Sequence, residues 1–274
     1  MTDLPALTEE LSLPSDDCAG FERDGHACIR GTASTEEVAA YLPVLRDIAL
    51  AHKAETRPLE ERGTYGRAFL QIPNLWRLDE RAAQFTLARR FAGIAAQLLG
   101  VERVRLYHDQ ALFKEAGGGR TPWHQDQPFW PLDTNKTVTM WMPLVDVDPE
   151  VGTMTFASGS HKLGNLGDVV PSDSSDEAFP KLIEDKGLSL HSYGALKAGD
   201  TTWHTGWTLH SAPTNDTDVL RAVMTIIYFA DGARVTEPNS RIQEVDKKVW
   251  LDDLPAGSLA AGSLNPIVWD AAWN

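Results

Sequence analysis

The stretch TPWHQDQPFW, residues 121–130, places a histidine and an aspartate two positions apart among aromatic residues. On a β-strand, residues i and i+2 point to the same face, so His124 and Asp126 would converge with Cα atoms about 6–7 Å apart. An imidazole and a carboxylate in this arrangement can be two adjacent ligands of one metal ion. The other interpretation is a solvent-exposed strand with some aromatic packing.

A metal site of this kind needs a third ligand, and the chain has eight histidines. His204 and His210 lie in the segment AGDTTWHTGWTLHSAPTND, where residues 201–211 are expected to form one strand. The two have the same parity along that strand, so both can face inward. The remaining histidines are interpreted as surface or core residues: His26, His52, His108, His161 and His191.

Arg221 follows His210 along the chain and lies early in the apolar run VLRAVMTIIYFADG. A buried arginine in such a run needs an anionic partner. The planar guanidinium binds a carboxylate through two parallel hydrogen bonds, so the carboxylate of a bound ligand is one candidate. A salt bridge to a nearby aspartate or glutamate is the other.

Two histidines and one carboxylate would leave one face of an octahedral metal ion open. That geometry favours Fe(II) in oxygenases. A bidentate organic acid and O₂ would then occupy the open face.

The elements that must position these residues begin with two amphipathic helices. The first spans residues 33–55 and starts with capping residues, although Pro43 should kink it or divide it in two. The second spans residues 80–100 and is closed by Gly100. Residues 1–17, which precede both helices, are expected to be a loose arm.

The rest of the chain has the pattern of strands. A short β-like run lies within residues 21–31, and β-branched or aromatic runs occupy residues 101–115, 136–147, 152–161 and 219–232. Helices followed by strands predict a mainly β protein, a barrel or two-sheet jelly roll with the N-terminal helices packed outside. Residues 163–194 are interpreted as a polar insert that forms a lid or a partly helical excursion. We expect residues 1–274 to form a single domain.

Charge and composition argue against several classes of partner. The formal net charge is -14 and no Lys/Arg-rich run occurs, so nucleic-acid binding is not expected. The N-terminus has no apolar signal-peptide core, and no apolar stretch reaches the roughly 18–20 residues of a membrane span. With only Cys18 and Cys28, the protein is expected to be cytoplasmic with reduced thiols.

Three segments together resemble the phytanoyl-CoA dioxygenase family: LYHDQALFKEAGGGRTPWHQDQPFW, TVTMWMPLVDVDPEVGTMTFASGSHK and LKAGDTTWHTGWTLHSAPTNDTDVLRAVMTIIY. Members of that family are Fe(II)- and 2-oxoglutarate-dependent oxygenases built on a double-stranded β-helix. The resemblance implies Fe(II), 2-oxoglutarate and O₂ as cofactor and cosubstrates. It also implies that His124, Asp126 and His210 hold the reactive iron centre.

The resemblance further implies a cosubstrate site. Arg221 would bind the distal carboxylate of 2-oxoglutarate, and Trp141 would lie beside the cosubstrate. Further candidates for contacts with the cosubstrate are Gln110, Lys114 and Thr121. Many relatives carry a serine two residues after the distal histidine, where this chain has Ala212. Its hydrogen bond would have to come from Ser211, Thr225 or a water.

The reaction implied by the resemblance is radical oxidation of a C–H bond, coupled to the decarboxylation of 2-oxoglutarate to succinate and CO₂. Hydroxylation is its default outcome. Asp126 argues against halogenation, because relatives that halogenate carry a small residue at this position. Desaturation, epimerisation and ring formation remain open.

The aromatic residues around these motifs are expected to wall a largely apolar substrate pocket. The main candidates are Gln127, Phe129, Trp130, His204, Trp207 and Phe69. Further candidates are Trp123, Trp203, Tyr65, Asn74 and Trp76. No basic cluster is available for the phosphates of coenzyme A, so a bulky small molecule such as a secondary-metabolite intermediate is a better candidate substrate than an acyl-CoA.

Two other functions compete with an oxygenase. A cupin-like metal-dependent isomerase or hydrolase would not use 2-oxoglutarate and would have no need for Arg221. A non-catalytic binding module on a degenerate barrel would have little reason to keep three buried polar ligands.

Overall fold

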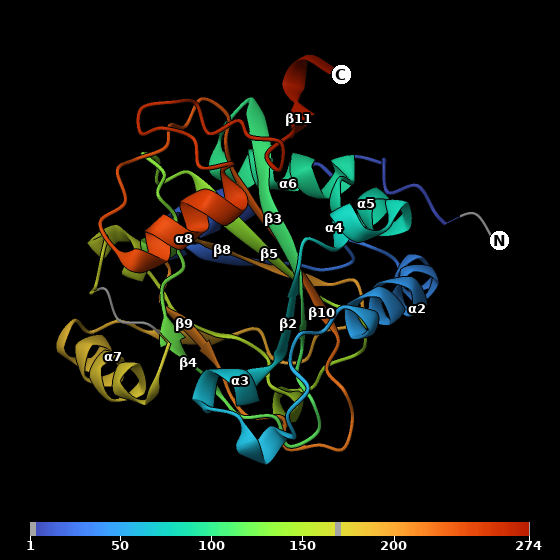
Figure 1. Cartoon of the computed structure of the whole chain (residues 1–274), viewed down its shortest axis with the longest axis vertical. Coiled ribbons are helices and arrows are strands. Elements are labelled where there is room, and N and C mark those ends of the chain that lie inside the picture. Colours follow the sequence, from blue (N-terminus) through green and yellow to red (C-terminus); the bar gives the residue numbers. More distant parts are fainter. Residues whose placement is uncertain (1–3, 168–170, 274) are drawn as a thin grey trace.

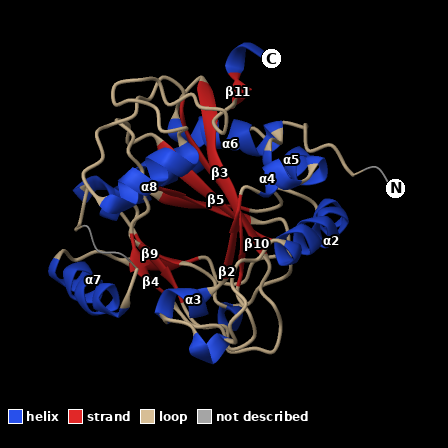
Figure 2. Ribbon diagram, in the orientation of Figure 1, coloured by secondary structure: helices blue, strands red, loops and turns tan. Residues whose placement is uncertain are grey.

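Two antiparallel sheets form the centre of the computed structural model, which describes residues 4–167 and 171–273 (Figure 1). The larger sheet has the strand order β1 (His26–Ile29), β8 (Thr201–Thr205), β5 (Thr137–Pro143), β10 (Val223–Ala230), β3 (Arg103–Phe113) and β11 (Ile267–Asp270), and β2 (Leu70–Pro73) also pairs with β3. The smaller sheet has the order β4 (Thr121–His124), β9 (His210–Ala212), β6 (Thr155–Ala157) and β7 (Leu190–Ser192). Figure 2 shows the strands as two separate groups. The prediction of a jelly-roll, double-stranded β-helix core is confirmed.

Helices cover the outside of this core. The α-helices are α1 (Ser15–Asp24), α2 (Thr35–Ala51), α3 (Thr64–Ala68), α4 (Leu75–Leu78), α5 (Glu80–Thr86), α6 (Arg89–Leu99), α7 (Asp173–Asp185) and α8 (Arg241–Trp250). Short 3₁₀ turns are η1 (Leu59–Glu61), η2 (Gln127–Phe129), η3 (Pro149–Val151), η4 (Ser160–Leu163) and η5 (Ala271–Trp273). Figure 1 shows α2, α4, α5 and α6 together on one flank of the larger sheet, with α7 and α8 on the other side of the molecule. None of these helices is long and apolar enough to cross a membrane.

Strand β10 shows how the larger sheet separates two environments. Met224, Ile226 and Tyr228 belong to the apolar core shared with α2, α5 and α6. Thr225 and Ile227, on the opposite face, line a cavity between the two sheets. This alternation follows from the two-residue period of a strand. One face of the sheet packs against the helices, and the other face is available to a ligand.

A β-bulge in β3 changes this alternation at one point. Ile227 pairs with His108 and Tyr228 pairs with Leu106, so Tyr107 has no partner on β10. As a result two adjacent side chains reach the inner side of the sheet: His108 lines the cavity, and Tyr107 packs with Trp130 in the neighbouring apolar cluster. Bulges commonly redirect side chains in this way next to active sites.

The helices differ from the sequence-based expectations in two places. Helix α2 continues from Thr35 to Ala51 without dividing at Pro43, because the fully buried Tyr41 and Leu45 hold both halves in the same core. The expected single helix over residues 80–100 is wrong: it is divided into α5 and α6. At the end of α5 the hydroxyl of Thr86 donates a 2.6 Å hydrogen bond to the buried carboxyl of Asp109, so tertiary contacts override the helical pattern there.

The expected single strand over residues 201–211 is also wrong. It forms two strands, β8 and β9, which belong to different sheets. The chain crosses between them at Gly206, where a Cβ atom would lie 2.5 Å from Oε1 of Gln127 and 2.6 Å from Oγ1 of Thr137. Only glycine permits this close approach, so the crossing is built into the sequence although the periodic pattern does not reveal it.

The polar insert is partly helical, as expected, since it contains α7 and β7. The expectation of a loose arm at residues 1–17 is wrong for the described part, because residues 15–17 begin α1 and Leu7 is only 2% exposed. Residues 1–3 lie outside the described residues. The arm is also tied by polar contacts: the hydroxyl of Tyr41 donates to Pro5 O, and Gln97 bonds Leu11 O and Leu13 N.

Replacing Leu7 with alanine should therefore lower the free energy of unfolding by about 2–4 kcal/mol, the usual cost of deleting a buried leucine side chain. Urea denaturation followed by circular dichroism measures this change. Thr8→Ala is the matched control, since Thr8 is exposed beside Leu7 and should leave the midpoint unchanged. Equal midpoints for Leu7→Ala and the unmodified protein would show that the arm contributes nothing to stability.

Candidate metal centre and ligand cavity

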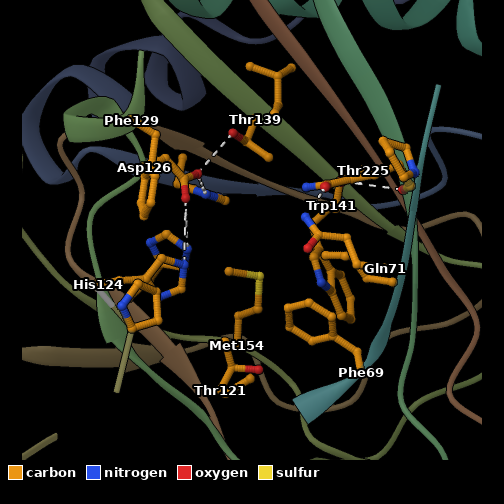
Figure 3. A pocket seen from close by; sticks show the side chains of 18 of the residues that line it. Phe69, Gln71, Thr121, His124, Asp126, Phe129, Thr139, Trp141, Met154 and Thr225 are labelled. Atoms are coloured by element: carbon orange, nitrogen blue, oxygen red, sulfur yellow. Dashed lines mark hydrogen bonds and ion pairs between the residues drawn. The ribbon is translucent and has the colours of Figure 1, made fainter. Parts of the chain in front are cut away.

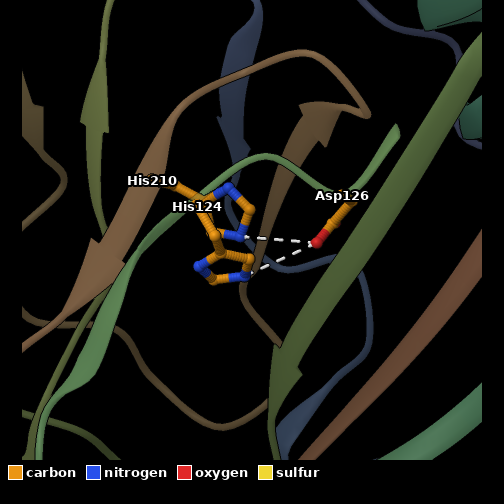
Figure 4. A group of neighbouring side chains, drawn as sticks. All are labelled: His124, Asp126 and His210. Atoms are coloured by element: carbon orange, nitrogen blue, oxygen red, sulfur yellow. Dashed lines mark ion pairs between the residues drawn. The ribbon is translucent and has the colours of Figure 1, made fainter. Parts of the chain in front are cut away.

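Three side chains form a compact cluster of metal-ligand type between the two sheets. One ligand atom from each of His124, Asp126 and His210 lies within 4.8 Å of the others. Nε2 of His124 is 3.5 Å and Nε2 of His210 is 3.9 Å from Oδ1 of Asp126 (Figure 4). The imidazole rings of the two histidines are 4.2 Å apart. This donor set is the one expected for a non-haem iron site with an open face.

Backbone carbonyls set the tautomer of both histidines. Nδ1 of His124 is 2.7 Å from Pro122 O, and Nδ1 of His210 is 2.9 Å from Thr208 O. A carbonyl only accepts, so each Nδ1 carries the proton and donates it, which leaves the Nε2 lone pair facing Asp126. Outer hydrogen bonds of this type orient metal-binding imidazoles, so the three residues fit a divalent iron ion.

The second carboxylate oxygen of Asp126 is held from the opposite side. Nε2 of His204 donates to Oδ2 at 3.2 Å, and the hydroxyl of Thr139 donates to the same atom at 3.3 Å. Oδ1 is thereby directed at the two ligand histidines. His204, predicted as a pocket residue, lines the cavity but mainly orients the carboxylate.

The charges of the cluster suit metal binding at neutral pH. Burial alone would raise the pKa of Asp126, but His210 and the other imidazoles hold that pKa well below its usual value. Burial lowers the pKa of His124, and it lowers the pKa of His210 still further. The carboxylate is therefore ionised while both ligand imidazoles are neutral, so no proton must leave before a metal binds.

The predicted geometry of the HxD motif is only half right. His124 ends β4 and pairs directly with His210 on β9, so these ligands face each other across two strands. Asp126 lies beyond the strand, in an αR conformation before η2. Its N–H donates to Gly206 O at 3.0 Å, and so does the N–H of Gln127 at 2.9 Å. A turn that these two hydrogen bonds fix, rather than the alternation of side chains along a strand, therefore places the carboxylate beside the two histidines.

The cluster opens into a cavity of about 350 Å³ between the sheets. Figure 3 shows His124 and Asp126 on one side of this space, with Trp141, Gln71 and Phe69 across from them. The predicted site residues that line the cavity, beside the three ligands, are Gln110, Thr121, Trp141, Arg221, Phe69, Phe129, Trp130, His204 and Tyr65. Ser211, Ala212 and Thr225, singled out in the sequence for a missing serine contact, line it as well.

Other predicted pocket residues do not line the cavity. Gln127 is buried behind it, where its Oε1 accepts from the hydroxyl of Thr137 at 2.5 Å. Trp207 turns outward and its Nε1 donates to Asn135. The remaining predictions that are wrong concern core and surface-facing residues: Trp123, Trp203, Asn74 and Trp76.

Arg221 lies at one end of the cavity and is 1% exposed. Its Nη1 donates to Gly152 O at 2.6 Å, and its guanidinium lies 5.4 Å from the centre of the Trp141 ring. Burial lowers the pKa of Arg221 to about 9, so it remains a cation at neutral pH. Among the described residues no carboxylate pairs with it, and its Nε has no hydrogen-bond partner. A buried cation without a carboxylate partner in this part of the chain is suited to binding an anionic ligand.

Lys114, a predicted cosubstrate contact, stands behind Arg221 rather than in the cavity. Its backbone pairs with that of Arg221, and its Nζ donates to Gly119 O at 2.6 Å and Pro213 O at 2.8 Å. Burial, with a smaller effect of the Arg221 cation, lowers the pKa of Lys114 to about 6. The side chain therefore tethers two loops and does not face a ligand.

Several cavity residues were not predicted from the sequence. They are Gln71, Pro73, His108, Leu112, Thr139, Met154, Pro171, Ile227, Asp246 and Trp250. The two-residue period of a strand, counted from Arg221 and Thr225, would have identified Ile227. Nothing in the chain's pattern marks Asp246 and Trp250, because helix α8 lies beyond the segments that carry the motifs.

A double-stranded β-helix with a two-histidine, one-carboxylate cluster beside a buried arginine defines a class of non-haem oxygenases. The chain matches the phytanoyl-CoA dioxygenase (PhyH) family over residues 21–223 and belongs to this family. It is therefore an enzyme of the type that uses iron, 2-oxoglutarate and O₂.

Individual relatives are similar over most of their length. A probable alpha-ketoglutarate-dependent hypophosphite dioxygenase of Stutzerimonas stutzeri is 26% identical over 219 residues, 76% of each chain. The epimerase SnoN from nogalamycin biosynthesis, solved with Fe³⁺, alpha ketoglutarate and nogalamycin RO, is 27% identical with a TM-score of 0.76. That match covers 92% of this chain and 97% of SnoN. The carbocyclase SnoK has a TM-score of 0.76 at 23% identity, over 93% of this chain and 96% of SnoK, and supports the fold.

Helix α7 of the polar insert is attached beside the cavity in two ways. Arg120 bonds both Asp173 and Asp176, and Asp176 also accepts from the N–H of Trp123 at 2.9 Å. On its other face the buried Phe179 and Ile183 pack with Ala157 and Leu209. Pro171, just before the helix, lines the cavity, so a movement of α7 would change access to it.

We expect α7 to act as a lid, and hence to exchange its amide hydrogens faster than β10. Arg120→Ala should speed exchange over residues 173–185 a further two- to fivefold, because exposed ion pairs contribute about 0.2–1 kcal/mol. The control is Lys197→Ala, which breaks the exposed Lys197–Asp146 pair outside α7 and should leave exchange over residues 173–185 unchanged. Uniformly strong protection of α7, equal to that of β10, would contradict a lid.

Proposed function

We propose that this enzyme oxidises, and by default hydroxylates, a C–H bond of a bulky small molecule, in a site built from His124, Asp126, His210 and Arg221. One observation carries the proposal. A buried guanidinium, with no carboxylate partner among the residues that the structure describes, shares a cavity with a three-ligand cluster whose outer face is open. 2-Oxoglutarate has the matching ends, a carboxylate for Arg221 and a keto acid for the metal.

The cavity residues between these two ends would orient the cosubstrate. Thr225 pairs across the sheet with Trp141 and with Gln110, so all three lie at the same level of the larger sheet. Trp141 already lies against the Arg221 guanidinium and would shield it from water, which strengthens its attraction for an anion.

The hydroxyl contact that relatives obtain from a serine has local substitutes. Thr121 pairs directly with Ala212 across β4 and β9, and both line the cavity. Thr225 also lines it, and its hydroxyl has only a long 3.4 Å hydrogen bond to Gln110 O. We therefore assign the missing serine contact to Thr121 and Thr225.

Iron, when bound with 2-oxoglutarate and O₂, would supply the oxidant for C–H cleavage. The chain's own task is to exclude water and to hold the target carbon near the open ligand face. Phe129 and Trp130 follow directly after Asp126 and line the cavity on that side. Their aromatic surfaces favour a substrate with a large apolar part.

The substrate class follows from the size and charge of the cavity. A volume of about 350 Å³ must hold 2-oxoglutarate as well as the reacting part of the substrate. Arg221 is the only lysine or arginine among the described lining residues, which leaves no cation for the phosphates of an acyl-CoA. Similarity to SnoN, which acts in nogalamycin biosynthesis, supports an intermediate of secondary metabolism.

Epimerisation is the second candidate reaction, because SnoN is an epimerase. It would return hydrogen to the carbon that lost it instead of adding a hydroxyl. Tyr65 lines the cavity, and its phenol hydroxyl, which donates to Oε1 of Gln71 at 3.2 Å, could supply that hydrogen. Oxygen from ¹⁸O₂ in the product would indicate hydroxylation, whereas solvent deuterium at an inverted carbon would indicate epimerisation.

Anaerobic visible absorption tests the cofactor assignment. Fe(II) and 2-oxoglutarate together should produce a charge-transfer band that neither produces alone, and His210→Ala should abolish it. His52→Ala is the control, since His52 is exposed at the end of α2. Iron binding without any band would favour a cupin-like isomerase or hydrolase instead.

The same titration tests Arg221. Arg221→Met should raise the 2-oxoglutarate concentration needed for half of the band on the order of 100-fold, the usual effect of removing a buried charge-assisted pair. Arg77→Met provides a matched control, because Arg77 also lies over a tryptophan ring, that of Trp76, but on the exposed surface. If both variants titrate like the unmodified protein, Arg221 does not bind the cosubstrate.

A further inference from the structure

The cavity has a second charged end, opposite Arg221. Arg221 lies two residues before β10 and precedes Ile227 by six positions, which corresponds to about 20 Å of extended chain. Ile227 pairs with His108 on β3 and with Thr139 on β5, and Thr139 is the residue that donates to Asp126. The metal cluster therefore lies near the His108 level of the sheet, and a substrate can approach it from the side away from Arg221.

Helix α8 closes this end of the cavity. Its residues Asp246 and Trp250 line the space, one helical turn apart. The helix is held in place by Gln243, whose Nε2 donates to Pro128 O at 3.0 Å within η2, directly after the ligand Asp126. The ring of Trp250 lies 4.6 Å from that of His108. Asp246 is thus fixed in the wall of the cavity rather than on a free surface.

The bulge in β3 supplies the partner of Asp246. Tyr107, redirected to the inner side, donates its hydroxyl proton to Oδ2 of Asp246 at 2.9 Å. The Tyr107 ring packs at 5.5 Å against Trp130, which also lines the cavity. One carboxyl group is therefore surrounded by the aromatic rings of β3, α8 and the segment after η2.

Asp246 has no counter-charge of its own. Among the described residues no lysine or arginine pairs with it, and its helical neighbour Lys247 pairs instead with Asp253 at 2.8 Å. Burial raises the pKa of Asp246 to about 7, against the opposing effect of hydrogen bonds from Tyr107 and Trp250. A partly buried carboxyl group without a cation is costly, and a cationic ligand would remove that cost.

We propose that the substrate carries a protonated amine, which Asp246 binds within the aromatic surroundings of Tyr107, Trp130 and Trp250. Carboxylate and aromatic faces together are the usual recognition elements for an organic ammonium group. This inference rests on the proposed oxygenase function, because it places the amine next to the carbon presented to the metal cluster. Family membership does not imply it, since Asp246 and Trp250 lie beyond residues 21–223, which match the family.

The alternative is a neutral hydroxyl donor at the same carboxyl group. A substrate with an ammonium group and a substrate with a hydroxyl group should respond differently when the charge of Asp246 is removed. An asparagine accepts a hydrogen bond from a hydroxyl nearly as well as a carboxyl group does, but it provides no ion pair for an ammonium group.

The test uses the protein loaded anaerobically with Fe(II) and 2-oxoglutarate and three probes: benzyldimethylamine, benzyltrimethylammonium and the neutral benzyl alcohol. Binding is followed by tryptophan fluorescence. Both cations should bind more tightly than benzyl alcohol, and Asp246→Asn should weaken them at least tenfold while leaving the alcohol unchanged. Glu244→Gln, on the exposed side of α8, should change none of the three.

A second variant separates recognition from folding. Trp250→Leu keeps the carboxyl group and removes one aromatic face, so it should weaken benzyltrimethylammonium severalfold. Cations that bind no better than benzyl alcohol, or equally well to Asp246→Asn, would overturn the amine proposal.

The iron and 2-oxoglutarate band, recorded in the same samples, reports on the oxygenase assignment independently. An intact band with no preference for cations would reject only the amine. Absence of the band in the unmodified protein would reject the oxygenase.

Discussion

The site depends on one carbonyl group, that of Gly206. It accepts hydrogen bonds from the N–H groups of both Asp126 and Gln127, and so fixes the turn that carries the carboxylate ligand. The same residue lies where the chain passes from the larger sheet to the smaller one, packed too closely against Gln127 and Thr137 for any side chain. The position of the carboxylate is thus tied to the crossing between the sheets, and four residues later that crossing delivers His210.

The cavity has the buried guanidinium of Arg221 at one end, the carboxyl group of Asp246 at the other and the charged ligand cluster between them. Within residues 4–167 and 171–273, no carboxylate pairs with Arg221 and no lysine or arginine pairs with Asp246, while Asp126 is surrounded by imidazoles. Unpaired buried charges oppose folding unless a ligand compensates them, so their persistence on one cavity indicates binding. Because the two groups lie at opposite ends, they would orient the bound molecules. The anionic cosubstrate is proposed to bind at Arg221, and the cationic group of the substrate at Asp246.

Two structural layers serve different purposes in this arrangement. The outer face of the larger sheet and helices α2, α5 and α6 make a conventional apolar core, which explains why Met224, Ile226 and Tyr228 alternate with cavity residues. Polar residues inside the cavity are positioned by backbone hydrogen bonds, by strand register and by side-chain hydrogen bonds such as those that His204 and Thr139 donate to Asp126. Such a scaffold can hold the metal ligands rigidly, while α8 closes one end of the cavity and α7 lies beside it.

Residue types in the sequence indicated a metal site at the HxD motif, a buried arginine and a two-sheet fold, because the HxD spacing and hydrophobic alternation are local patterns. The choice of His210 as the third ligand came from the family resemblance. Tertiary structure alone decided which neighbours face the ligand. Gln127 and Trp207 turned away because a crossing glycine and an outer asparagine engaged them. Lys114 turned toward two loop carbonyls. Asp246 and Trp250 joined the cavity from a distant helix, since contacts between segments more than a hundred residues apart leave no periodic trace in the chain.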